Sequence, residues 1–148
     1  MHKFDANTAL QLDNQLCFAL YSASLAMTKL YTPLLSALNL TYPQYLVLLV
    51  LWEQDGLTVS QLGERLHLNS GTLTPLLKRM ETSDLLARSR SAEDERRVLV
   101  TLTPQGRALK AQAAQIPPCV AKATDCSLSD LISLTGQLKA LRDRLHDS

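Results

Sequence analysis

The feature that most constrains the fold of this 148-residue chain is a change of hydrophobic period between residues 57 and 103. Two short segments, "TVSQLGERLHL" and "NSGTLTPLLKRMETSDLL", carry apolar residues at helical spacing. Thr58 can cap the first segment, and Asn69 with Ser70 opens the second, which predicts two helices joined by a tight turn. The next segments, "LLARSRS" and "RRVLVTLT", follow a period of two and predict strands joined by the polar tip "SAEDER".

A helix-turn-helix followed at once by a charged hairpin predicts a winged helix-turn-helix, in a fold that is mainly α with a small β-hairpin wing. Helical spacing also predicts a long helix over about residues 10–38, which Pro33 should end or kink. A nearly continuous apolar run in "LTYPQYLVLLVLWEQDG" predicts the most buried helix. After the hairpin, Thr103-Pro104 should open a further helix, "QIPPC" should break it, and Ser127 should cap the last one.

The distribution of charge supports a nucleic-acid partner more than the formal net charge of +1 does. Residues 78–110 hold eight Lys or Arg and five Asp or Glu, a net of +3, whereas residues 1–77 carry a net of −2. A local basic excess beside a DNA-binding motif is typical of phosphate contact. The longest apolar run is too short to span a bilayer, and no apolar stretch suits a signal peptide. We therefore expect a cytoplasmic protein without a membrane partner.

The second helix of the motif should place its N-terminal side chains on base edges in the major groove. Hydroxyl groups can hydrogen-bond several bases, and cations one turn later suit phosphates or guanine. Wing arginines can enter a narrow minor groove, and Asp94 should orient a neighbouring arginine. The alternative is that these are ordinary solvated polar side chains. The predicted DNA contacts are Ser70, Thr72, Thr74, Pro75, Lys78, Arg79, Asp94, Arg96 and Arg97.

The three cysteines, an odd number, argue against a fully paired disulfide scaffold. Cys17 lies one helical turn before Tyr21 in "LDNQLCFALYSAS". A peroxide-reactive cysteine must be a thiolate, and no Lys or Arg lies nearby in sequence to stabilise one. Hydrogen bonds would have to do so, and Tyr21 is within reach at i+4. A cysteine that only fills core space is the simpler interpretation of this spacing. With no CxxC motif and no nearby histidine, we expect no metal and no cofactor.

The segment "NSGTLTPLLKRMETSDLLARSRSAEDERRVLVTLTPQGRAL" resembles the DNA-binding lobe of MarR-type winged-helix repressors, whose wing typically carries "DERR". "LDNQLCFALYSAS", "LTYPQYLVLLVLWE" and "SGTLTPLLKRM" together resemble the organic-hydroperoxide-sensing OhrR branch. The likeness covers essentially residues 10–145. It implies one domain over residues 1–148, with a DNA-binding lobe over 41–110 and dimerisation helices over 1–40 and 111–148.

This resemblance also implies a function. A symmetric homodimer would bind a pseudo-palindromic operator in double-stranded DNA, and an organic hydroperoxide would release it by oxidising a cysteine that matches Cys17. The family tyrosines that hydrogen-bond this cysteine match Tyr31 and Tyr42, with Tyr21 as a further match. Tyr31 and Tyr42 are too far from Cys17 along the chain to be its neighbours on the helix. They must therefore reach it by folding or from the second subunit.

Two-cysteine members of this branch carry a resolving thiol before the C-terminal helix, where Cys119 and Cys126 are both candidates. Cys119 is slightly favoured because it follows two prolines that can start a helix. Two other functions remain open. The same fold could respond to a phenolic or lipophilic ligand without covalent chemistry. A thiol peroxidase could also use Cys17, but it would leave the wing without a role, so we expect no enzyme.

Overall fold

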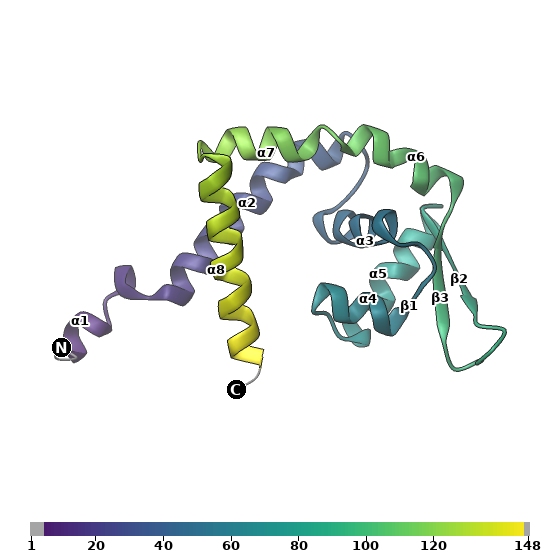
Figure 1. Ribbon diagram of the computed structural model, residues 1–148, viewed down its shortest axis with the longest axis horizontal. Coiled ribbons are helices and arrows are strands. Elements are labelled where there is room, and N and C mark those ends of the chain that lie inside the picture. The colour runs from purple at the N-terminus through teal and green to yellow at the C-terminus, as the bar shows by residue number, and fades with distance from the viewer. Residues whose placement is uncertain (1–4, 147–148) are drawn as a thin grey trace. The chain divides into compact units, whose positions relative to one another are not determined.

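The computed structural model describes residues 5–146 and divides the chain into two compact units, residues 1–112 and 113–148. The fold is mainly helical with one small antiparallel sheet, as predicted (Figure 1). The elements in chain order are α1 (Ala6–Ala9), the 3-10 helix η1 (Leu12–Asn14), α2 (Leu16–Ser36), α3 (Tyr42–Glu53), β1 (Leu57–Thr58), α4 (Val59–Leu66), α5 (Ser70–Thr82), β2 (Leu86–Arg90), β3 (Val98–Leu102), α6 (Pro104–Ala113), α7 (Ile116–Thr124) and α8 (Leu128–His146).

The core of the first unit is built around α3, as its apolar run predicts. Val47, Leu48 and Leu51 are almost completely buried there. The start of α3 is closed by a capping box: Gln44 N donates to Thr41 Oγ1, and Thr41 N donates to Gln44 Oε1. Two backbone donors that would otherwise lack partners are thereby satisfied, and this gives α3 a well-defined first turn.

The predicted helix-turn-helix is formed by α4 and α5. Thr58 caps α4 and Asn69 caps α5, both as predicted. The turn between them is tight because Gly63 allows a close backbone approach, where an added Cβ would lie 2.6 Å from the carbonyl oxygen of Leu68. His67, in the left-handed conformation at φ 57°, ends α4 and redirects the chain.

The wing is the β2–β3 hairpin, in which Leu86 pairs with Leu102 and Arg90 with Val98. It projects from the helices of its lobe in Figure 1. The two-residue strand β1 pairs with β3 and completes a sheet of order β1-β3-β2. We did not predict β1, because two residues are too few to show a period.

The base of the wing is tied to α3 and α6. Trp52 Nε1 donates to the carbonyl oxygen of Gly106 at 3.0 Å. Asp55 accepts from the Leu102 backbone N at 2.9 Å and from Arg107 Nη2 at 3.2 Å. α6 starts where predicted, with Thr103 Oγ1 accepting from the Gly106 N at 3.0 Å. The recognition motif, the wing and α6 therefore form one connected lobe.

The predicted start of the N-terminal helix was wrong. The N-terminal segment is not one helix from residue 10: the chain is extended at Gln15, whose Nε2 donates to the Ala9 and Gln11 carbonyls and holds the break. The other end of this segment lies close to the predicted residue 38, since α2 continues through Pro33 to Ser36; Pro33 does not end the helix, and the alternative that it kinks the helix stays a prediction. In the second unit, the break precedes Ile116, and the prolines of "QIPPC" lie in the first turn of α7, where their missing N–H is tolerated.

None of the helices in residues 5–146 is both long and apolar enough to cross a bilayer. The last helix, α8, is capped by Ser127 as predicted, since the Asp130 N donates to Ser127 Oγ at 3.1 Å.

Candidate functional site

All the predicted contact residues on α5 lie on its exposed face. The opposite face of α5 is buried through Leu73, Leu76, Leu77 and Met80. Because apolar residues hold one side of the helix in the core, its polar side is presented to solvent along its whole length. The exposed predicted residues are Ser70, Thr72, Thr74, Pro75, Lys78 and Arg79.

The C-terminal end of α5 is attached to the wing by an ion pair. Arg88 donates to the Glu81 carboxylate through both its backbone N and Nη2, each at 3.1 Å. These two hydrogen bonds hold the pKa of the Glu81 carboxyl below its ordinary value. The end of α5 is therefore joined directly to strand β2 of the wing.

The wing tip contains a compact charge cluster. Arg96 Nε donates to Asp94 Oδ1 at 3.1 Å, and Arg97 Nε lies 3.8 Å from Asp94 Oδ2. The hydrogen bond from Arg96 lowers the pKa of Asp94, so this carboxylate stays charged. Arg90 Nη1 donates to the Glu95 carbonyl at 2.7 Å and closes the turn. The expectation that Asp94 orients a neighbouring arginine is confirmed, while the Arg96 side chain stays 91% exposed.

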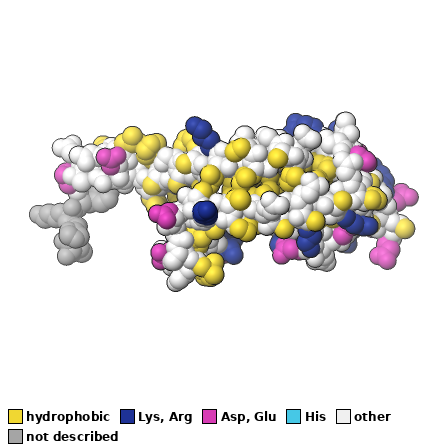
Figure 2. Space-filling model, turned by 90° about the horizontal axis from the view of Figure 1, so that it is seen from above, with side chains coloured by type: hydrophobic (Ala, Val, Ile, Leu, Met, Phe, Trp, Pro, Cys, Tyr) yellow, Lys and Arg dark blue, Asp and Glu magenta, His cyan; other side chains and the backbone are white. Residues whose placement is uncertain are grey.

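The wing is the most highly charged end of its lobe, and acidic and basic side chains gather there in Figure 2 (right-hand end). A cavity of about 300 Å³ lies between the two wing arginines and the start of α4, where Ser60 and Gln61 also line it. Guanidinium groups and the N–H groups of a first helical turn both favour anions such as a DNA phosphate. The sequence analysis did not single out these α4 residues.

Cys17 lies in the first turn of α2, and its side chain is exposed. The interpretation of Cys17 as a packed core thiol is therefore wrong within this chain. Its position also differs from the expected middle of a helix, because α2 begins at Leu16. Tyr21, one turn later, is 59% exposed. Among the described residues, no hydrogen bond joins the Tyr21 hydroxyl to the Cys17 thiol.

Tyr31 and Tyr42 come together, and the structure adds a third tyrosine to them. Ring centroids are 5.0 Å apart for Tyr31 and Tyr42, 5.9 Å for Tyr31 and Tyr45, and 6.4 Å for Tyr42 and Tyr45. We call these three residues the tyrosine cluster. Sequence reasoning missed Tyr45, although its i+3 spacing from Tyr42 on one helix face was a usable signal.

The tyrosine cluster is a set of hydrogen-bond donors at neutral pH. Burial raises the pKa of Tyr31, of Tyr42 and of Tyr45 above the ordinary value of 10.0. The neighbouring phenols add to this for Tyr31 and Tyr45, since a charge on one ring would repel a charge on the next. All three hydroxyl groups therefore keep their protons.

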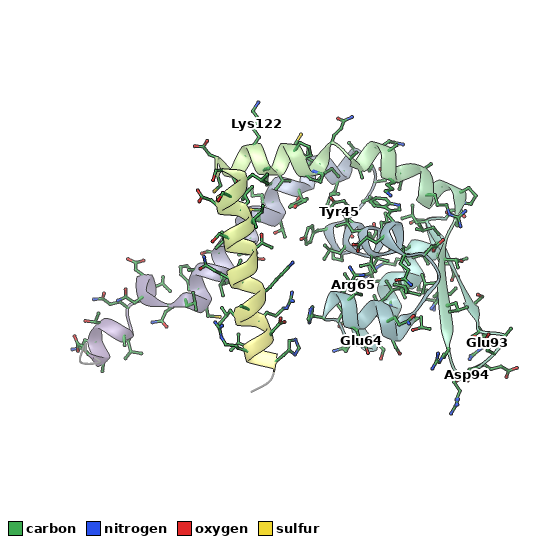
Figure 3. The ribbon with its side chains drawn as sticks, viewed as in Figure 1. Tyr45, Glu64, Arg65, Glu93, Asp94 and Lys122 are labelled. Carbon is green, nitrogen blue, oxygen red and sulfur yellow. The ribbon has the colours of Figure 1, made fainter. Side chains whose placement is uncertain are left out.

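Within one chain, the cluster cannot contact Cys17. Cys17 and Tyr31 are fourteen residues apart on the same helix, which at 1.5 Å per residue is about 21 Å. Figure 3 shows Tyr45 at the start of α3 and Asp94 at the wing tip, so the cluster is also remote from the wing. Folding of one chain thus places the thiol and the phenols at separate points.

The two remaining cysteines are both exposed, and all three cysteines are free. Cys119 lies near the start of α7, where its N donates to the Gln115 carbonyl at 3.3 Å. Cys126 lies between α7 and α8, where its Sγ donates to the Thr124 carbonyl at 3.4 Å. Within residues 5–146, no group of three or more His, Cys, Asp or Glu side chains is placed to hold a metal ion.

Two long helices present apolar side chains to solvent. None of the described residues of α8 is buried, and Ile132 is 65% exposed. In α2, only Leu35 is buried, and Leu16 and Leu25 are among its exposed apolar residues. Large exposed apolar patches are typical of protein–protein interfaces, because helices gain most of their stability from packing.

Comparisons with known proteins agree with this geometry. A family model described as "Transcriptional regulator SarA/Rot" matches residues 29–113. The organic hydroperoxide resistance transcriptional regulator of Bacillus subtilis is 52% identical over 145 residues, which cover 98% of this chain and 97% of the relative.

Solved structures of AbfR, a Staphylococcus epidermidis protein, are also similar. Reduced AbfR bound to DNA has a TM-score of 0.76 at 33% identity, covering 95% of this chain and 99% of AbfR. The disulfide-formed AbfR has a TM-score of 0.65 at 34% identity, covering 96% and 97%.

Proposed function

This chain belongs to the MarR-type winged-helix transcriptional regulators, in the organic-hydroperoxide branch, and from this membership we propose that it represses transcription as a homodimer that releases its operator when an organic hydroperoxide oxidises Cys17. The observation that carries the proposal is the exposed Cys17 thiol in the first turn of α2. The capping residue Gln15 supplies no side-chain acceptor there, so the free N–H groups of this turn favour a nearby negative charge.

The chemistry is a two-electron oxidation of sulfur. The Cys17 thiolate attacks the terminal oxygen of the hydroperoxide, an S–O bond forms, and the O–O bond breaks. The products are a sulfenic acid and an alkoxide, which takes a proton from water to become the alcohol. The thiolate needs donors to stabilise it, and the protonated phenols of the tyrosine cluster are suitable groups.

We place the donors on the second subunit. The separation of about 21 Å along α2 excludes a contact with Tyr31 of the same chain. In a symmetric dimer with α2 near its partner, Cys17 of one subunit faces Tyr31 and Tyr42 of the other. An apolar setting around these phenols also favours organic hydroperoxides over hydrogen peroxide. Tyr21, on the same chain as Cys17, completes the proposed redox site.

The exposed apolar helices support the dimer. In α8, five leucines recur at alternating spacings of three and four residues, which is the stripe of a helix that packs against other helices. We assign residues 1–40 and 111–148 to dimerisation and residues 41–110 to the DNA-binding lobe, within one MarR-type domain over residues 1–148. The stripe consists of Leu131, Leu134, Leu138, Leu141 and Leu145.

Two lobes related by a twofold axis suit a pseudo-palindromic operator. The polar face of α5 would contact bases, and Arg96 and Arg97 would contact the backbone or a minor groove, with Asp94 holding both arginines. Oxidised Cys17 would then form a disulfide with Cys119 or Cys126: the sulfenic oxygen leaves as water while an S–S bond forms. The exposure of both thiols is compatible with either choice.

The test is a gel shift on an inverted-repeat operator with and without cumene hydroperoxide. The native protein should release DNA, and Cys17→Ser should bind equally well but stay bound. Cys119→Ser and Cys126→Ser are matched controls, because each removes one thiol but leaves Cys17 able to undergo the first oxidation. Cumyl alcohol, which has the same shape without an O–O bond, should have no effect; release by the alcohol would indicate a regulator that responds to a non-covalent ligand. Sustained peroxide turnover with a thiol reductant would instead indicate a thiol peroxidase.

A further inference from the structure

We propose that Tyr45 is a positioning residue of the redox site: its ring holds Tyr31 and Tyr42 in the orientation in which their hydroxyl groups can reach Cys17 of the partner subunit. This inference rests on the proposed function and deepens it. None of the roles considered above involves Tyr45. It would act through the other two rings rather than by touching the reacting sulfur, since it is the most buried of the three.

The first argument is burial. The Tyr45 side chain is only 4% exposed, whereas Tyr31 and Tyr42 keep part of their surface in solvent. A residue that stabilises a thiolate from another subunit must present its hydroxyl group at the surface of its own chain. Tyr31 and Tyr42 are partly exposed and so are suited to this, whereas Tyr45 is part of the buried core.

The second argument is the geometry of the three rings. Each ring contacts the other two at centroid distances of 5.0 to 6.4 Å, within the range of favourable aromatic pairs. All three pairs are tilted, with interplanar angles of 59°, 45° and 48°. Because each tilted ring lies against the other two, a turn of one ring would press on its neighbours. Removal of Tyr45 leaves a single pair that can rotate.

The third argument is that Tyr45 is itself held firmly. It lies in the first turns of α3, and its N donates to the Thr41 carbonyl at 3.0 Å, beside the capping box. Tyr31 comes from a different helix, α2. Tyr45 therefore transmits the fixed position of the α3 start to a phenol on the neighbouring helix. Because the aromatic ring and not the hydroxyl group carries this role, phenylalanine at position 45 should preserve it.

The experiment compares Tyr45→Leu with Tyr45→Phe in the full-length protein. The measured quantity is the second-order rate constant for sulfenic acid formation at Cys17 with cumene hydroperoxide, across a range of pH. Tyr45→Leu should lower the rate constant at neutral pH about tenfold and move the rate profile to higher pH. Tyr45→Phe should keep both within twofold of the native protein. Operator affinity of the reduced protein should be unchanged in both variants.

Leu51→Ala is the matched control, because Leu51 is 1% exposed on another face of α3. It should lower stability without moving the rate profile. If Tyr45→Leu does not fold, Tyr45→Met fills the space without a rigid ring face. Native rates in the Leu or Met variant, or an equal loss in Tyr45→Phe, would overturn the role of the ring. The proposed function fails separately, if native Cys17 does not react or Tyr31→Phe has no effect.

Discussion

The separation of Cys17 from the tyrosine cluster leads to a test with mixed dimers. One subunit carries Cys17→Ser with intact tyrosines, and the other carries Tyr31→Phe and Tyr42→Phe with an intact Cys17. A hydrogen bond requires about 3.5 Å or less, and the thiol lies about 21 Å from Tyr31 of its own chain. Tyr21 stays intact on the same chain, but the intact thiol can then obtain the phenol donors of the tyrosine cluster only from the other subunit, and the mixed dimer holds one complete site.

The magnitude follows from the two lost hydrogen bonds. A hydrogen bond to a charged group contributes about 1.5–3 kcal/mol, and losses within one cluster are not additive, so we expect a roughly ten- to hundredfold slower reaction in the Phe homodimer. In an equal mixture that reassorts at random, about half of the intact thiols belong to mixed dimers. Stopped-flow oxidation should therefore show a fast phase, at the native rate, containing about half of the reacting thiol.

Native mass spectrometry measures the fraction of mixed dimers and serves as the control for exchange. Homodimers of each variant, measured alone, should show no fast phase. If mixed dimers are present and the intact thiols react only at the slow rate of the Phe homodimer, the arrangement across two subunits is wrong.

Four further expectations follow from the structure. Gly106→Ala should lower the free energy of unfolding in urea by about 2–4 kcal/mol, because its Cβ collides with the Leu85 carbonyl oxygen; a loss below about 0.5 kcal/mol would contradict this. Leu138→Glu should shift the protein from dimer to monomer in sedimentation, since this leucine is exposed in the α8 stripe. Arg96→Ala should reduce the salt slope of operator binding by about 2 per dimer, and an unchanged slope would remove this residue from the phosphate contacts. Because Arg96 holds the pKa of Asp94 below 3.8, their ion pair should be intact at neutral pH and lost only as pH falls through that lowered value, as carbon-13 NMR of the carboxyl group can show.

Most of the lobe was predictable because its signals are local. Thr58, Asn69 and Thr103 cap the helices that the sequence predicted, and the change of period located both long strands of the wing. Predictions failed where a distant or subtle contact decided the outcome. Gln15 breaks the N-terminal helix by hydrogen-bonding carbonyls six and four residues before it. β1 forms only because β3 lies beside it.

The candidate site was predictable to a lesser degree. The exposed face of α5 follows from the spacing of its apolar residues, so the positions of the predicted DNA contacts on that face are confirmed; their contact with DNA stays a prediction. The residues of the redox site were identified from a resemblance to a family. Their exposure and the distances between them were not predicted from the sequence. Nothing in the order of residues indicates that Tyr45 packs against Tyr31, since the two belong to different helices.

By itself, the amino-acid order determined a winged helix-turn-helix with a charged tip, because caps, turns and hydrophobic periods depend on neighbours within a few residues. Tertiary structure alone decided that three phenols from α2 and α3 meet and that the thiol on α2 lies exposed. The length of α2 places this thiol about 21 Å from Tyr31 of the same chain. The physical reason is that distances between side chains on different helices depend on how the helices pack. A straight helix, in turn, sets a separation that no rotation of its side chains can close.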